Sequence, residues 1–462
     1  MVFSSLTFLC VFLPAVLILD RVCPDIRLKN AFLLIASLLF YAYGEPVYVL
    51  LMIASSLLNY IWALMISTLP LKRLFMTCSV ITNLGALVFF KYSVFLTTWF
   101  NTTFGASVPV PDVTLPLGIS FFTFQAMSYV IDVYRGDCKV QKNYARLLLY
   151  ISFFPQLIAG PIVKYRDIES EISSRKVTAE TTAHGIRRFA EGLAKKVFIA
   201  NNVAVIADTV FNAQTSDISM SGAWIGALAY MLQIYFDFSG YSDMAIGLGL
   251  MFGFHFKENF NYPYISGSIK EFWRRWHISL STWFKEYLYI PLGGNRKGRV
   301  RTVINKFIVF ACTGIWHGAN WTFLFWGLYH GAFLMIEEIL PKKDKTNPVL
   351  NVMKHLYLIL VVLIGFVMFR CDSIRAFGIM LNKMLIPGVS SASANMLLLS
   401  VLTPVNLTAL AAGIVFSMPV GQKLKENKYM NGLSYVLAVF AVVFAFMSLS
   451  SGSYNPFIYF RF

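Results

Sequence analysis

Residues 47–66 read VYVLLMIASSLLNYIWALMI, and this run of twenty residues contains no charged side chain. A helix of about 20 mostly apolar residues is long enough to cross the hydrocarbon core of a bilayer. No water is present there to bond the backbone, so a spanning segment must satisfy its own N–H and C=O groups, as a helix does. The run therefore predicts a transmembrane helix.

Apolar runs of the same character recur along the chain, and several are short enough to be tilted or partial spans. Together they predict an all-α fold, a polytopic transmembrane bundle of about 11–12 spans, in one membrane-embedded domain over residues 1–462. The predicted spans are Phe3–Leu19, Ala31–Tyr43, Val47–Ile66, Leu74–Phe95, Leu115–Tyr134, Val197–Phe211, Ala223–Phe252, Val303–Trp316, Trp321–Ile339, Leu356–Phe369, Leu397–Phe416 and Leu433–Leu449.

The composition agrees with a bilayer as the solvent of this chain. Hydrophobic residues make up 57% of it and charged residues only 13%, against about 25% charged in soluble domains. The net charge of +16 lies mainly in short loops between apolar runs and forms no basic face with interleaved aromatics, so no nucleic-acid partner is expected. Six cysteines without a CxxC pair suggest neither a zinc site nor a disulfide framework.

Basic residues in the loops predict the orientation of the chain. Arg21, Arg27 and Lys29 follow the first run, whereas residues 99–114 contain no lysine or arginine. Cytoplasmic loops collect lysine and arginine, so the first loop is expected inside and the loop 99–114 outside. Alternation along the predicted spans then places both termini on the extracytoplasmic side, with membrane lipid around the helices.

Two apolar stretches do not fit as spans. Leu147–Val163 is broken by Pro155, Gly160 and Pro161 and has basic residues on both sides, so it is expected to enter the membrane and return. Glu271–Leu292 is amphipathic at helical spacing and predicts one re-entrant or interfacial helix. Irregular backbone at membrane depth is tolerated where protein or a water-filled cavity receives its polar groups, and the two breaks therefore suggest a cavity.

His317 is the first candidate for chemistry. It lies between two apolar runs whose outer flanks, residues 296–301 and 342–345, are basic, which makes it the tip of a membrane-buried hairpin. Ionisable groups at that depth are costly and usually functional, and imidazole can accept a proton from a hydroxyl near neutral pH. The alternative is a buried histidine that only bonds a neighbouring carbonyl.

Two further histidines and one basic turn carry weaker signals. His277 follows the Phe272–Trp276 tract and could be an interfacial residue, and His330 sits farther along the second run of the hairpin. The glycine-rich turn with Arg296 and Lys297 could hold the phosphates of a soluble donor, or anionic lipid, or act only as a topology signal.

Asp237 and Tyr241 lie one helical turn apart within an apolar run. They could line a polar tunnel, or belong to a satisfied network of hydrogen bonds between helices. No GxSxG elbow, HExxH motif or P-loop spacing is present, so neither a metal site nor a tightly bound cofactor is expected.

Several tracts together resemble the membrane-bound O-acyltransferase (MBOAT) family, in its bacterial alginate O-acetylation branch. The likeness covers essentially the whole chain, and the motifs are specific in combination although each alone is weak. The matching tracts are Met1–Ser5, Pro116–Gln125, Phe154–Ile162, Tyr235–Asp243, Phe272–Ser281, Tyr289–Lys297, Thr313–Phe323 and Asn455–Phe460.

This resemblance implies a ring of helices around a thinned centre with a central tunnel, in a bacterial cytoplasmic membrane. It implies His317 as the catalytic histidine and His277 as the second polar position. The donor would be a cytoplasmic acyl thioester, most simply acetyl-CoA, and the acceptor a polysaccharide hydroxyl outside. His277 or Asn320 would stabilise the oxyanion, and a separate extracytoplasmic esterase-like acetyltransferase could receive the acyl group.

Three other functions stay open from the sequence. Within the family, the acceptor could be peptidoglycan or another cell-surface glycan, or the reaction could be D-alanyl transfer to teichoic acid from a carrier protein. Outside it, a transporter with a histidine relay would need no thioester, but the chain has no obvious inverted repeat.

Overall fold

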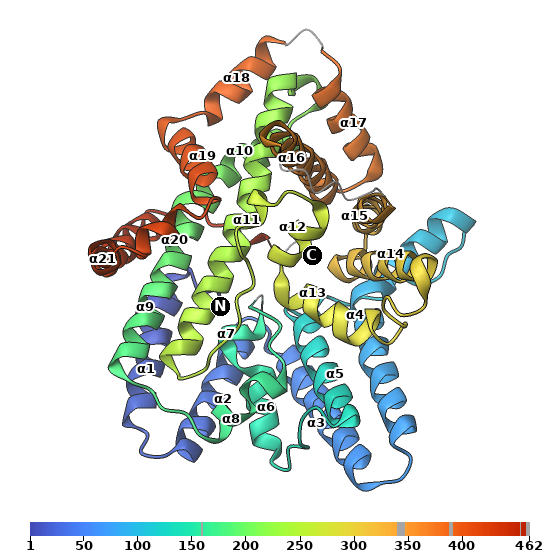
Figure 1. The fold of residues 1–462 in the computed structure, drawn as a ribbon, viewed down its shortest axis with the longest axis vertical. Helices are drawn as coiled ribbons and strands as arrows, with labels where there is room; N and C mark the ends of the chain where they lie inside the picture. Colours follow the sequence, from blue (N-terminus) through green and yellow to red (C-terminus); the bar gives the residue numbers. More distant parts are fainter. Residues whose placement is uncertain (159, 340–346, 388–390, 453, 459–462) are drawn as a thin grey trace. The chain divides into compact units, whose positions relative to one another are not determined.

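The computed structural model describes residues 1–158, 160–339, 347–387, 391–452 and 454–458, and within these ranges all regular structure is helical (Figure 1). The predicted all-α fold is confirmed. Two compact units emerge, one of Met1–Phe189 with Ser242–Lys257 and one of Ala190–Tyr241 with Glu258–Phe462. The single domain predicted over residues 1–462 stays a prediction. Residue 159 of the tract Phe154–Ile162, residues 342–345 of the basic flank after the His317 hairpin, and residues 459–460 of the tract Asn455–Phe460 lie outside the described ranges.

The first unit is a helical assembly in which α3 packs against α4 and α5, and α2 packs against α6. Asn59 of α3 and Asn83 of α4 exchange amide hydrogen bonds of 3.0 and 2.7 Å between these apolar helices, a polar contact that stabilises helix pairs in lipid. Its elements are η1 (Phe8–Phe12), α1 (Leu13–Val22), α2 (Ile26–Ala42), α3 (Tyr48–Thr68), α4 (Lys72–Phe104), α5 (Ile119–Arg135), α6 (Tyr144–Ser152), α7 (Phe154–Leu157), α8 (Tyr165–Ser173) and most of α9 (Ala179–Ala194).

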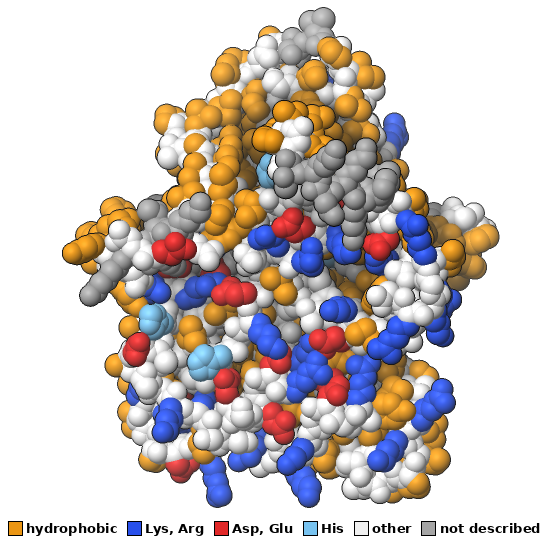
Figure 2. All heavy atoms as spheres, in the orientation of Figure 1, with side chains coloured by type: hydrophobic (Ala, Val, Ile, Leu, Met, Phe, Trp, Pro, Cys, Tyr) orange, Lys and Arg blue, Asp and Glu red, His pale blue; other side chains and the backbone are white. Residues whose placement is uncertain are grey.

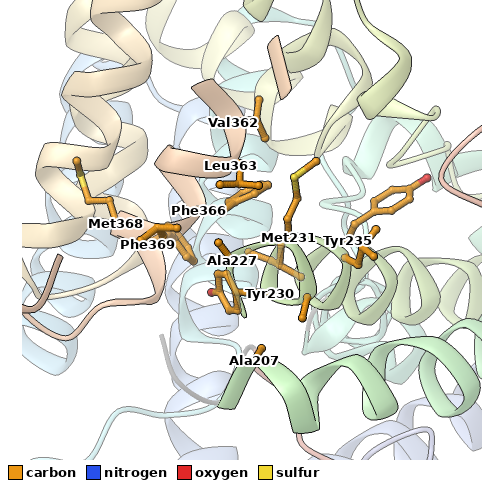
Figure 3. Close-up of a cluster of buried hydrophobic side chains, with 14 of the residues drawn as sticks. Ala207, Ala227, Tyr230, Met231, Tyr235, Val362, Leu363, Phe366, Met368 and Phe369 are labelled. Atoms are coloured by element: carbon orange, nitrogen blue, oxygen red, sulfur yellow. The ribbon is translucent and has the colours of Figure 1, made fainter. Parts of the chain in front are cut away.

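The second unit contains the candidate chemistry. Its core joins α10, α11 and α16, and Figure 3 shows Ala207, Met231 and Phe366 among the side chains gathered there. Its elements are η2 (Lys195–Ala200), α10 (Asn201–Phe211), η3 (Thr215–Asp217), α11 (Met220–Met251) up to residue 241, η4 (Pro263–Ile265), α12 (Ile269–Arg275), α13 (Ile278–Phe284), η5 (Lys285–Tyr289), α14 (Gly298–His317), α15 (Trp321–Ile339), α16 (Pro348–Arg370), α17 (Ile374–Leu385), α18 (Ala392–Val401), α19 (Pro404–Phe416), α20 (Val420–Lys425) and α21 (Lys428–Ser450).

Both stretches that did not fit as spans are broken. In Leu147–Val163, α6 ends at Ser152 and the short α7 begins with Phe154 and Pro155. Its return to the same side of the membrane stays a prediction.

The prediction of one continuous helix over Glu271–Leu292 is wrong. The segment is split into α12, α13 and η5, and the break falls at Trp276 and His277. His277 adopts a left-handed backbone conformation with φ 43°, which a continuous right-handed helix cannot contain. The apolar face is confirmed, since Phe272, Trp276, Leu280, Trp283 and Tyr287 are all buried.

Four helices in the described ranges are long and apolar enough to cross a membrane: α3, α4, α16 and Tyr429–Ser450 of α21. A fifth span is obtained if α18 and α19, which bend by 73° at their junction, count as one. Leu399 and Val405 of this pair are more than 60% exposed, and Figure 2 shows apolar side chains over both helices. The twelve predicted spans lie largely within helices, and the chain is a multi-pass membrane protein. The count of 11–12 spans stays a prediction.

Candidate active site

A small cavity lined by buried side chains in the second unit has His277 and His317 in its wall. Its volume is about 20 Å³, and about 10–15 Å³ is enough for one water molecule. Apart from the two imidazole rings, the described side chains around it are apolar or aromatic: Ile234, Phe238, Trp276, Trp326, Phe366, Phe369 and Ile458. The structure therefore brings together the two histidines that the sequence proposed as a catalytic pair.

His317 occupies the tip of the predicted hairpin, as the last residue of α14. Its ring contacts Trp326 of α15 and Phe369 of α16 edge-on, each with centroids 5.1 Å apart. The side chain is 8% exposed. These perpendicular aromatic neighbours restrict the tilt of the imidazole and exclude bulk water from it.

A close crossing of α14 and α15 holds this tip. A Cβ on Gly314 would lie 2.3 Å from the backbone oxygen of Phe323, and a Cβ on Gly327 would lie 2.3 Å from that of Phe310. Only glycine permits backbones to approach so closely. The two glycines therefore set how far His317 projects from the helix pair.

His277 sits at the break between α12 and α13, and its position depends on Asn259. Nδ1 of His277 lies 3.2 Å from Oδ1 of Asn259, and the N–H of Ile278 donates to the backbone oxygen of Asn259 at 2.9 Å. The N–H of Ser279 donates to the same Oδ1 at 3.1 Å. Because a backbone N–H can only donate, the atom facing His277 is the amide oxygen rather than its nitrogen.

That contact fixes the tautomer of a neutral His277. Nδ1 must carry the proton to bond Oδ1 of Asn259, so Nε2 presents a lone pair. His277 could then donate from Nε2 to an oxyanion only as an imidazolium. Asn259 was missed by the sequence reasoning because it lies 18 residues before His277 in a loop without a recognisable pattern.

His330 packs against Trp326 and Trp273, with ring centroids 5.1 Å apart in both pairs. The turn at Gly318–Asn320 folds α15 back along α14, so His317 and His330 share Trp326 as a neighbour. His330 is completely buried and is not among the described residues around the cavity.

Asn320, Asp237 and Tyr241 do not line the cavity among the described residues. The amide of Asn320 donates to the backbone oxygen of Asp372 at 2.8 Å and accepts from the N–H of Thr322 at 3.1 Å. Asp237 forms an ion pair with Lys196, and Tyr241 stacks on Phe457 with centroids 4.9 Å apart.

Arg296 and Lys297 also lie away from the cavity, exposed on a compact glycine turn. The buried Asn305 holds this turn by donating to the backbone oxygens of Gly294, at 2.9 Å, and Leu292, at 3.3 Å. Gly293 and Gly294 both have positive φ. Both cations therefore face solvent on a turn that hydrogen bonds hold in place. This geometry is compatible with binding either an anionic donor or lipid headgroups.

Comparison with known proteins places this arrangement in a family. A profile described as the membrane-bound O-acyltransferase family matches residues 140–380, more than half of the 462-residue chain. The "Probable alginate O-acetylase AlgI" of Pseudomonas putida is 40% identical, and the match covers 100% of both chains. The protein of the same name from Pseudomonas aeruginosa is 44% identical over 89% of this chain and 79% of its own.

A relative that acts on another polymer is almost as similar. The "Peptidoglycan O-acetyltransferase" of Helicobacter pylori is 40% identical over 73% of this chain and 70% of its own. The family predicted from the sequence tracts is confirmed. The chain therefore belongs to the MBOAT family, in its alginate O-acetylation branch, and is an O-acyltransferase.

Proposed function

We propose that this enzyme moves an acetyl group from a cytoplasmic thioester, acetyl-CoA, to an extracytoplasmic hydroxyl during polysaccharide O-acetylation. The observation that carries the proposal is the presence of two histidines in the wall of one buried cavity. A buried site strengthens electrostatic interactions with the reacting atoms and keeps water from competing with the acceptor. The names of the relatives add support for acetyl transfer to a glycan.

His317 is the proposed general base. The acceptor oxygen attacks the thioester carbonyl carbon while the His317 ring takes the hydroxyl proton. A C–O bond forms, the C–S bond then breaks, and the departing thiolate receives the proton from the imidazolium. The products are an ester and a free thiol, and His317 returns to its neutral form.

His277 is proposed to orient the acceptor. With its Nδ1 proton bonded to Asn259, a neutral His277 accepts a hydrogen bond at Nε2 and can hold the incoming hydroxyl. Arg296 and Lys297 would meet the phosphates of the donor at its cytoplasmic entrance. We expect an indirect role for Asn320, Asp237 and Tyr241. They would hold the backbone and side chains around the site in place through the contacts described above.

The acceptor side is proposed to involve a partner. The acetyl group would pass to an extracytoplasmic esterase-like acetyltransferase, or directly to a glycan such as an alginate-like exopolysaccharide. The enzyme would lie in the bacterial cytoplasmic membrane, with membrane lipid around its apolar helices and both termini outside.

Purified protein supplied with acetyl-CoA and a soluble oligosaccharide tests the reaction. We expect release of free CoA thiol in equal amount to the ester formed, because each transfer breaks one C–S bond. Thiol titration and mass spectrometry of the oligosaccharide measure the two products. Turnover of a carrier-bound D-alanyl thioester alone would contradict the acetyl donor, and no turnover of any thioester, even with the esterase-like acetyltransferase supplied, would favour a transporter.

The orientation is tested by cysteine labelling in a background that lacks the six native cysteines. Asp112 and Lys139 are exposed residues on loops that flank α5. We expect Asp112→Cys to react with a membrane-impermeant maleimide in cells whose outer membrane alone is opened. Lys139→Cys should react only after the cytoplasmic membrane is opened as well. The reverse pattern would contradict the proposed topology.

A further inference from the structure

A buried ion pair in the second unit holds a backbone segment near the end of the chain. Nζ of Lys196 lies 2.7 Å from Oδ1 of Asp237, and the two side chains are 3% and 1% exposed. Each partner also binds the backbone of the same segment. Lys196 donates to the backbone oxygen of Pro456, and the N–H of Ile458 donates to Oδ2 of Asp237 at 2.8 Å.

Further polar contacts anchor the residues just before this point. The hydroxyl of Tyr454 donates to Oδ2 of Asp208 at 2.7 Å, and the other oxygen of Asp208 pairs with Arg370 at 2.8 Å. Asn201 donates to the side chain of Asn455 at 3.2 Å. A second ion pair and an amide contact therefore fix the segment upstream of Ile458.

Stability alone does not account for the Lys196–Asp237 pair. Removing two charges from water is costly, and well-packed apolar residues in place of a buried ion pair are often equally stable or more so. The contacts to Pro456 and Ile458 indicate that the pair positions this segment, because both charged groups bind its backbone and residues 454–457 lie outside any helix.

This segment carries one wall of the histidine cavity. Ile458 is 3% exposed and faces the same cavity as His277 and His317. Most of the other described wall residues project from the long helices α11, α14, α15 and α16. Ile458 instead follows a segment without regular structure, and its N–H donates to Asp237.

We infer that Ile458 sets the length of the acyl group that the enzyme accepts, and that Lys196 and Asp237 are its positioning residues. This inference rests on the proposed function. The cavity is small, about 20 Å³ where about 10–15 Å³ is enough for one water molecule, so an acyl chain two carbons longer than acetyl would press on its wall. The Ile458 side chain forms part of the wall that a longer chain would meet.

Ile458→Ala tests the wall directly. The truncation opens the cavity beyond Cβ, so kcat/KM for butyryl-CoA relative to acetyl-CoA is expected to rise about tenfold or more, the discrimination that a few methylene contacts provide. Ile206→Ala is the matched control, because Ile206 is also buried, 0% exposed against 3% for Ile458, but is not among the described cavity residues. It should leave the ratio unchanged.

The double variant Lys196→Met with Asp237→Leu tests the positioning. It removes both charges together, so no unpaired charge is left buried and the protein should remain folded. With the contacts to Pro456 and Ile458 removed, Ile458 should hold the wall less firmly even though Tyr454 and Asn455 keep their contacts, and the butyryl-to-acetyl ratio should rise toward that of Ile458→Ala. Thermal unfolding of the purified double variant checks its fold.

The outcomes separate this inference from the proposed function. An unchanged ratio in Ile458→Ala, with acetyl transfer intact, overturns the role of Ile458 and leaves the proposed function standing. A changed ratio in Ile458→Ala but not in the folded double variant overturns the role of the ion pair. A native enzyme that prefers butyryl-CoA overturns both the acetyl donor and the inference.

Discussion

Replacing His317 with alanine is expected to lower acyl transfer by about 10²–10⁴-fold, the usual contribution of general acid–base catalysis. The ring lies in the cavity wall beside His277, and alanine leaves no group there to take the hydroxyl proton. Membrane insertion and donor binding should persist, because His317 is the last residue of α14 and not part of its interior. Initial rates of acetyl transfer at matched expression measure the loss.

Two sets of variants make this result specific. His355→Ala makes the same chemical change outside the described cavity residues and should keep the native rate. His277→Asn should retain more activity than His277→Ala, since an amide can still donate to Oδ1 of Asn259 in place of Nδ1. Near-native turnover by His317→Ala would show that the base lies elsewhere.

The fold class could be predicted from the sequence because lipid imposes a simple constraint. Long apolar runs must be helical, and the predicted spans lie largely within helices of the structure. The break at His277 could not be predicted in the same way. Apolar residues keep helical spacing on both sides of the break, from Phe272 to Tyr287. The hydrophobic periodicity therefore continues although the helix is interrupted.

The site could be predicted only in part for a different reason. His317 stands out because an ionisable group between apolar runs is unusual, whereas His277 alone is a weak signal and the resemblance implied its role. The partners of these residues come from distant parts of the chain. Ile458 and Asp237 are 221 positions apart in the sequence, and no local sequence pattern indicates that they are in contact. The sequence shows Asp237 as a carboxylate in an apolar run, but it gives no indication of the partners of Asp237.

Gly314→Ala is expected to lower acyl transfer by about 10²-fold, although residue 314 is not among the described cavity residues. The new Cβ would lie 2.3 Å from the backbone oxygen of Phe323 and 3.2 Å from Cα of Gly327. Backbone atoms cannot rotate away as a flexible side chain can, so α14 and α15 must separate. His317 follows one turn later, and a displacement of about 1 Å can cost about 10²-fold in rate.

Gly378→Ala in α17 is the matched control, because its Cβ would meet nothing within 4 Å. Gly327→Ala supplies the reciprocal test, since its Cβ would lie 2.3 Å from the backbone oxygen of Phe310. Both variants force apart the same helix pair, so their effects on kcat should not add in the double variant. Losses that multiply would mean that the two glycines act independently. Native kcat in Gly314→Ala would show that the crossing does not position His317.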